Sequence, residues 1–150
     1  SFKILDMPDR AAVERHEADE PFIVGGLQYG MQIYRYDAHV PYTFRDCPRT
    51  KGNIQFLILA FDKQDQGDLR VELEPAHRGY CDAIHNSCIT FGTLADDENK
   101  IIGTLMILDA KIIEAARDVW ENDPFVSGAL FETVEFYRWR FGRIFDQFSG

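Results

Sequence analysis

The feature that most constrains this chain is the order of its apolar patterns between residues 53 and 141. Four segments carry the apolar runs or the alternation typical of strands, and two carry the three- and four-residue spacing of amphipathic helices. The predicted strands are residues 53–61, 87–95, 100–108 and 131–141, and the predicted helices are residues 68–86 and 109–122. The order β-α-β-β-α-β predicts a ferredoxin-like α+β fold, with a four-stranded antiparallel sheet and both helices on one face.

Three local details accompany this prediction. Pro75 lies inside the first helical pattern, so we expect a kink there or two consecutive helices. Asp109 is expected to cap the second helix. In the last strand, alternation places Val134 and Phe136 towards the helices and puts on the opposite face Phe131, Thr133, Glu135, Tyr137 and Trp139.

The second face of the predicted sheet needs a cover. Its first and third strands are apolar on both faces, whereas an antiparallel sheet with one solvated face alternates apolar and polar residues. We expect a homodimer in which the two sheets pack face to face, with the N-terminal segment wrapped around the rim. The predicted organisation is an extension over residues 1–52 with little regular structure, which wraps the domain or a partner, and a domain over residues 53–150.

The extension has a few weak local patterns. Residues 8–20 are typical of a short helix, and residues 22–24 and 31–36 are typical of short strands. The glycines of residues 25–30 have neither the spacing nor the Lys-Ser/Thr ending of a phosphate-binding loop, so a turn is expected and no nucleotide cofactor.

Composition excludes several classes of partner. The chain has 25 acidic and 16 basic residues and a formal charge of -9, which argues against nucleic-acid binding and against anionic membrane surfaces. No apolar run approaches the ~20 residues of a transmembrane helix. Three cysteines without framework spacing favour a reducing compartment, with a soluble cytoplasmic protein as the default. The start at Ser1 would fit a processed organellar protein, for example of a plastid, or a trimmed chain.

His77 and Asp123 are the candidate catalytic residues. His77 follows the apolar stripe of the first helix, so it is either a hydrogen-bonded core histidine or a general base or acid. Asp123 precedes Pro124, which is the pattern of a helix N-cap, and its second oxygen can still bind a histidine. A metal site from His77, Cys81, His85 and Cys88 is disfavoured, because eight helical residues rise ~12 Å and the two histidines cannot share one ion. We therefore predict no metal.

The stretch from about residue 54 to residue 145 resembles the YCII-related family of the dimeric α/β barrel superfamily. The resemblance rests on LILAFDKQDQGDLRVELEPAH, on TFGTL, and on DPFVSGALFETVEF followed by Gly142-Arg143-Ile144-Phe145. Two family motifs are present, as Pro75-Ala76-His77 and Asp123-Pro124-Phe125. The resemblance implies that His77 and Asp123 meet in a cleft and transfer protons on a small oxygenated molecule, by elimination or isomerisation without a cofactor.

The sequence also departs from the family pattern. Glu74 stands where the family often has an arginine, so Arg70 or Arg78 would have to supply that charge, and Thr93 follows Gly92 where proline is common. Residues 1–52 match nothing in the family pattern.

Two functions follow from these observations. The first is a His77–Asp123 enzyme of the lyase or isomerase type, with Arg70, Glu135 and Tyr137 on the substrate side. For Glu135 and Tyr137 the alternative is an aromatic dimer interface. The second function is a non-catalytic accessory subunit of a larger assembly, such as an organellar complex, in which the fold serves as an interaction module.

Overall fold

The computed structural model describes residues 2–26 and 30–141. Gly142–Phe145, the end of the family resemblance, lies outside the described residues. The chain forms two compact units, Ser1–Tyr34 and Arg35–Gly150. This division falls ahead of residue 52, where the sequence analysis ended the extension, so residues 35–52 belong to the larger unit. That the extension wraps the domain or a partner stays a prediction.

The smaller unit contains two helices, α1 (Arg10–Ala18) and α2 (Pro21–Val24). The first lies within the predicted residues 8–20, and it begins after Asp9, whose side chain accepts a hydrogen bond of 2.7 Å from the N–H of Ala12. The predicted strand at residues 22–24 is wrong, since these residues form α2. Pro21 has its φ fixed near the helical value, which favours a helical first turn at this point.

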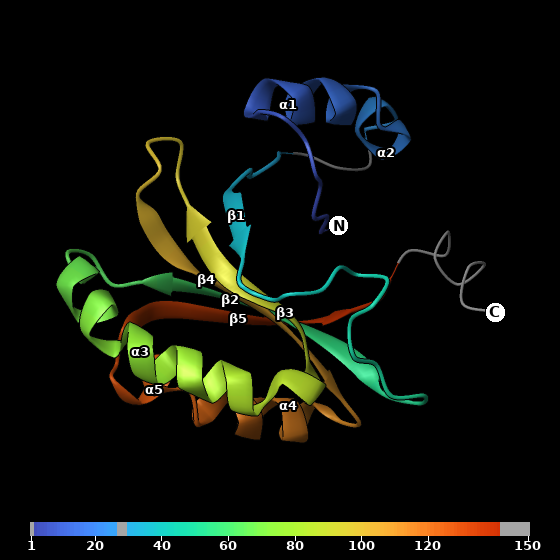
Figure 1. Ribbon diagram of the computed structural model, residues 1–150. Coiled ribbons are helices and arrows are strands. Elements are labelled where there is room, and N and C mark those ends of the chain that lie inside the picture. The colour runs from blue at the N-terminus through green and yellow to red at the C-terminus, as the bar shows by residue number, and fades with distance from the viewer. Residues whose placement is uncertain (1, 27–29, 142–150) are drawn as a thin grey trace. The chain divides into compact units, whose positions relative to one another are not determined.

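The larger unit is built on one antiparallel sheet with the strand order β1-β3-β4-β2-β5. The strands are β1 (Arg35–Ala38), β2 (Ile54–Asp62), β3 (Cys88–Ala95), β4 (Ile101–Ala110) and β5 (Phe131–Trp139). The helices are α3 (Gly67–Ala83), the 3-10 turn η1 (His85–Ser87), α4 (Ile113–Glu121) and the short α5 (Pro124–Ser127). From β2 onwards the order confirms the predicted β-α-β-β-α-β fold, and Figure 1 shows α3 and α4 along the sheet.

The core lies between the sheet and these two helices. Phe56, Ile58 and Met106 of the central strands pack there with Cys81 of α3 and Trp120 of α4. α3 is a single helix with Pro75 inside it, so the predicted split into two helices does not occur. Pro75 has no N–H to donate to the carbonyl of Val71. Because Val71 is exposed, water can donate a hydrogen bond to that carbonyl instead.

The sheet has five strands rather than the four predicted from the sequence. β1 is the additional strand, and it pairs with β3 at the sheet edge. Gly92 makes this pairing possible, because a Cβ at that position would lie 1.9 Å from the carbonyl oxygen of Asp37. The segment is also held by the N–H of His39, which donates to Phe91 at 2.8 Å, and by a 2.7 Å bond between the hydroxyls of Tyr36 and Thr90.

Asp109 does not cap a helix as predicted. It lies in β4 on the sheet face away from the core, opposite Gln55. Its buried carboxylate accepts hydrogen bonds from the N–H of Thr50 at 2.8 Å, from Asn53 at 3.0 Å and from Gln55 at 2.9 Å. Three bonds at a buried carboxylate outweigh one helix cap, and they hold the polar loop before β2 against this face. A homodimer as the cover for this face stays a prediction.

A bulge changes the alternation at the start of β5. Asp62 pairs with Phe131 whereas Phe61 pairs with Thr133, so the register skips one residue. Phe131 therefore turns towards the helices and stacks on Trp120 at 5.3 Å, and its predicted place beside Thr133 is wrong. Phe136 faces the helices as predicted, with its ring edge-on to Trp120 at 6.3 Å.

None of the helices in the described parts of the chain has the length and apolar character needed to cross a membrane.

Candidate active site

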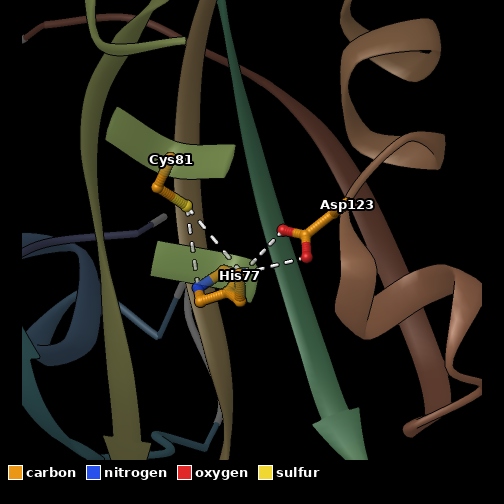
Figure 2. A group of neighbouring side chains, drawn as sticks. All are labelled: His77, Cys81 and Asp123. Atoms are coloured by element: carbon orange, nitrogen blue, oxygen red, sulfur yellow. Dashed lines mark hydrogen bonds and ion pairs between the residues drawn. The ribbon is translucent and has the colours of Figure 1, made fainter. Parts of the chain in front are cut away.

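His77 of α3 and Asp123, which precedes α5, meet in the interior of the larger unit (Figure 2). The Nδ1 atom of His77 lies 2.9 Å from each carboxylate oxygen of Asp123. Asp123 is also the N-cap of α5, where its Oδ1 accepts a 2.8 Å bond from the N–H of Phe125. Capping and histidine binding therefore coexist in one carboxylate. Because a carboxylate accepts, Nδ1 of His77 carries the hydrogen and Nε2 is left with the lone pair.

Aromatic rings and a thiol enclose this pair. His77 is 2% exposed and Asp123 is 0% exposed. The imidazole stacks on Phe125 with 3.9 Å between ring centroids, and Phe91 meets it edge-on at 5.9 Å. The sulfur of Cys81 lies 3.6 Å from Nε2. The ring is thus fixed in one orientation, as proton transfer requires, and it is shielded from solvent.

A cleft of about 910 Å³ is lined in part by α3, the helix that carries His77. It is bounded by the end of β1, the loop of residues 63–67, one side of α3 and the turn between β3 and β4. His77 is not among its lining residues, although Glu74 and Arg78, one turn before and one residue after it on α3, are.

Arg70 is the most deeply buried charged residue of the cleft lining, with a side chain that is 6% exposed. Its Nε and Nη2 atoms donate to Asp62 at 2.6 and 2.7 Å, and Nη2 also donates to the hydroxyl of Thr104 at 2.9 Å. The guanidinium lies 4.6 Å from the ring centroid of Phe125, whose ring also stacks on His77. Within residues 2–26 and 30–141, Nη1 of Arg70 is the one buried side-chain nitrogen or oxygen without a hydrogen-bond partner.

Two further pairs of polar side chains line the cleft. Arg78 donates to Glu74 at 2.6 Å, so the glutamate that replaces the family's usual arginine holds a neighbouring arginine. His39 lines the cleft from the end of β1, with its Nε2 3.4 Å from Oδ2 of Asp37. Burial, and secondly the positive charge of Arg78, lower the pKa of His39 from its ordinary value.

Glu135 and Tyr137 lie away from this cleft. Both are exposed on β5, opposite Leu59 and Leu57, on the sheet face that does not pack on the helices. The hydroxyl of Tyr137 donates to Oε2 of Glu135. The structure thus brings Arg70 to the neighbourhood of His77 and Asp123, and leaves Glu135 and Tyr137 apart from them.

One group of described residues has the composition of a metal site. The ligand atoms of His77, Cys81 and Asp123 lie within 4.8 Å of one another. A metal-binding cysteine must be a thiolate, and burial raises the pKa of Cys81 far above its usual value. Asp123 also already accepts from Nδ1 of the histidine. The geometry therefore favours a hydrogen-bonded pair with a neutral thiol beside it.

Sequence reasoning missed His39 and Thr104. His39 follows a four-residue strand without apolar alternation, inside the segment that was assigned to the extension. Thr104 belongs to a strand pattern in which threonine carries no sign of a polar role, although it lies opposite the small Ala60, next to the buried arginine.

An antiparallel sheet with α3 and α4 packed against it defines a ferredoxin-like α+β domain, and its interior holds a histidine–aspartate pair. The chain belongs to the YCII-related domain family, which matches residues 54–140. A solved structure of 5-chloro-2-hydroxyhydroquinone dehydrochlorinase (TftG) from Burkholderia phenoliruptrix, in complex with 2,5-dihydroxybenzoquinone, is similar with a TM-score of 0.56 and 24% identity over 60% of this chain and 97% of that chain. None of the curated proteins matches the chain.

Proposed function

We propose that this chain is an acid–base enzyme of the lyase or isomerase type that acts on a small oxygenated molecule without a cofactor. The observation that carries the proposal is the contact of 2.9 Å between Nδ1 of His77 and Asp123, beside a cleft lined by Arg70. A carboxylate on one ring nitrogen fixes the tautomer, orients the ring and stabilises the imidazolium that forms when the other nitrogen takes a proton.

His77 acts as the base in this proposal. Its Nε2 takes a proton from a hydroxyl group of the substrate, and the electron pair of the O–H bond forms a carbonyl. In an elimination, the leaving group departs as an anion with the electrons of its bond to carbon. In an isomerisation, His77 returns the proton to a carbon atom instead. Neither reaction transfers electrons to a cofactor, and such acid–base assistance contributes ~10² to 10⁴ in rate.

Arg70 supplies the binding contact on the substrate side. A buried donor is nearly always hydrogen-bonded, so the unpartnered Nη1 of Arg70 calls for an oxygen atom from a ligand or from water. The guanidinium charge is already balanced by Asp62. A neutral carbonyl or hydroxyl oxygen of the ligand therefore suits this donor better than a negatively charged group. A charged group would have to be desolvated although the positive charge of Arg70 is already paired with Asp62.

Chloride release from 5-chloro-2-hydroxyhydroquinone tests the proposal, because the structural neighbour is named for that reaction. Chloride is measured with an ion-selective electrode for the wild type, His77→Ala and a control, His85→Gln. His85 is exposed on η1, outside the cleft lining, and bonds to the carbonyl of Asp82 at 2.9 Å.

We expect turnover by the wild type and by His85→Gln, and its loss in His77→Ala with the fold intact by circular dichroism. Isomerase-type substrates are assayed in parallel through exchange of deuterium from solvent into hydroxylated quinones. Turnover that survives His77→Ala would show that this histidine is not the base.

A non-catalytic accessory subunit is the second candidate function. The observation that favours it is the burial of the pair, because a ligand reaches His77 only if the side chains around that histidine move. Size-exclusion chromatography of native material separates the two candidates. A homodimer of ~35 kDa, twice the 17.3 kDa of the chain, favours the enzyme, and co-migration with a much larger assembly favours the subunit.

A further inference from the structure

Two histidines, each beside a carboxylate, contact the ring of Phe91. The buried pair is His77 with Asp123, and the second is His39 with Asp37 at the end of β1, where Nε2 lies 3.4 Å from Oδ2. The ring of Phe91 meets each imidazole edge-on, with 5.9 Å between ring centroids in both cases. Of the two histidines, His39 lines the cleft and His77 does not.

We propose that His39 is the proton acceptor that a ligand meets in the cleft, and that the strand preceding the family domain contributes it. This inference rests on the proposed function only in taking the cleft as the binding site of a small hydroxylated molecule. Residue 39 lies outside residues 54–140, the part of the chain that matches the family. The site of this chain would thus include a group that the matched region by itself lacks.

The backbone holds His39 in place independently of its side chain. Its N–H donates to the carbonyl of Phe91 at 2.8 Å, directly after the four residues of β1 that pair with β3. The hydroxyl of Tyr42, three residues later, donates to the carbonyl of Cys88. The position is therefore fixed from both sides, and the imidazole is a preorganised group whose replacement leaves the strand intact.

The charges around His39 suit a neutral imidazole that can take a proton. Arg78 and Glu74 face it from α3, Asp37 faces it from its own strand, and its side chain is 9% exposed. Burial and the charge of Arg78 lower the pKa of His39, which favours the neutral ring, and a neutral ring has a lone pair for the proton of a ligand hydroxyl. In the transfer the O–H bond of the ligand breaks, its electron pair stays on oxygen, and an N–H bond forms. Asp37 and Glu74 then stabilise the imidazolium.

para-Nitrophenol tests this role, because it is a planar phenol whose absorbance changes when it loses its proton. The probe is titrated at constant pH into the full chain as wild type, His39→Gln and His85→Gln, and both its affinity and the phenolate fraction of the bound probe are read from the spectrum. We expect the wild type and His85→Gln to increase the phenolate fraction. We expect His39→Gln to abolish that increase and to weaken binding about tenfold, which is the effect of one lost hydrogen bond.

The outcomes separate this inference from the proposed function. Equal spectra and affinities for the wild type and His39→Gln, or no binding of the probe by the wild type, would overturn the inference. His77→Ala is expected to retain probe binding and the phenolate increase while losing turnover. Turnover that persists in His77→Ala, together with a probe response that depends on His39, would overturn the proposed function and leave this inference standing.

Discussion

Substitution of Gly92 by alanine is expected to release β1 from the sheet without unfolding the domain. A Cβ at this position would lie 1.9 Å from the carbonyl oxygen of Asp37, whereas ordinary contact begins at 3.4 Å. The backbone of β1 must therefore retreat by about 1.5 Å, the difference between these distances. The 2.8 Å bond from the N–H of His39 to Phe91, lengthened by that amount, leaves hydrogen-bond range.

The loss of hydrogen bonds in Gly92→Ala is expected to stay local because β1 is a four-residue strand at the sheet edge. Each lost hydrogen bond costs about 0.5–1.5 kcal/mol, so the edge opens at a small cost in global stability. Gly103→Ala is the matched comparison. Its Cβ would lie 2.2 Å from the carbonyl of Ala60, between two central strands that cannot move apart, and overpacking there costs about 1–3 kcal/mol or more.

Hydrogen exchange of backbone amides, with urea unfolding alongside, distinguishes these two effects. In Gly92→Ala, the amide of His39 should lose its protection while the amides of β2 and β4 keep theirs. Gly103→Ala should lower the free energy of unfolding and the protection of the whole sheet. If the amide of His39 stays protected in Gly92→Ala, or if the two variants are equally destabilised, the close approach of β1 is not what fixes this edge.

Two further predictions concern stability. Asp123→Ala removes the acceptor for His77 and for the N–H of Phe125 at a site with 0% exposure. Urea unfolding should therefore show a decrease of about 2–4 kcal/mol in the free energy of unfolding. Asp123→Asn keeps one acceptor oxygen and should show a smaller decrease. Equal decreases for Asp123→Ala and Asp123→Asn would show that the retained oxygen does not stabilise the fold. The folded-state pKa of His39 is lowered, so the unfolded chain binds a proton first as the pH falls below 6.5, and stability should decline there from its full value at higher pH. Urea unfolding between about pH 7.5 and about pH 5.5, one pH unit either side of that value, should give a shallower decline for His39→Gln, and parallel profiles would contradict the prediction.

The central elements of the fold could be predicted because their patterns are long and their cores are apolar. β2 and β4 are buried runs, and Trp120 of α4 packs in the core where the helical spacing places it. The pairing of Asp123 with His77 followed from the family resemblance. Neither local segment indicates by itself that residues 46 positions apart will meet.

The missed features depend on tertiary contacts that no local pattern records. The sequence indicates a short strand at residues 31–36, but the pairing of β1 (Arg35–Ala38) with β3 depends on the close approach that Gly92 permits, which hydrophobic alternation cannot indicate. Asp109 has the local sequence of a helix cap, and only the approach of Thr50 and Asn53 from the preceding loop makes it a strand residue. Phe131 changes face through a bulge, and a bulge leaves no trace in the spacing of the apolar residues around it.

The place of β1 in the sheet has a practical consequence for work with the family-matched region. A fragment that begins near residue 54 would lack β1 and would expose the backbone N–H and C=O groups of β3 along the sheet edge. Such an unpaired edge is a template for strands of other molecules, and here it carries the buried apolar side chains of Phe91 and Leu94. A fragment cut at the family boundary should therefore self-associate, whereas one that begins at Arg35 keeps its own edge strand.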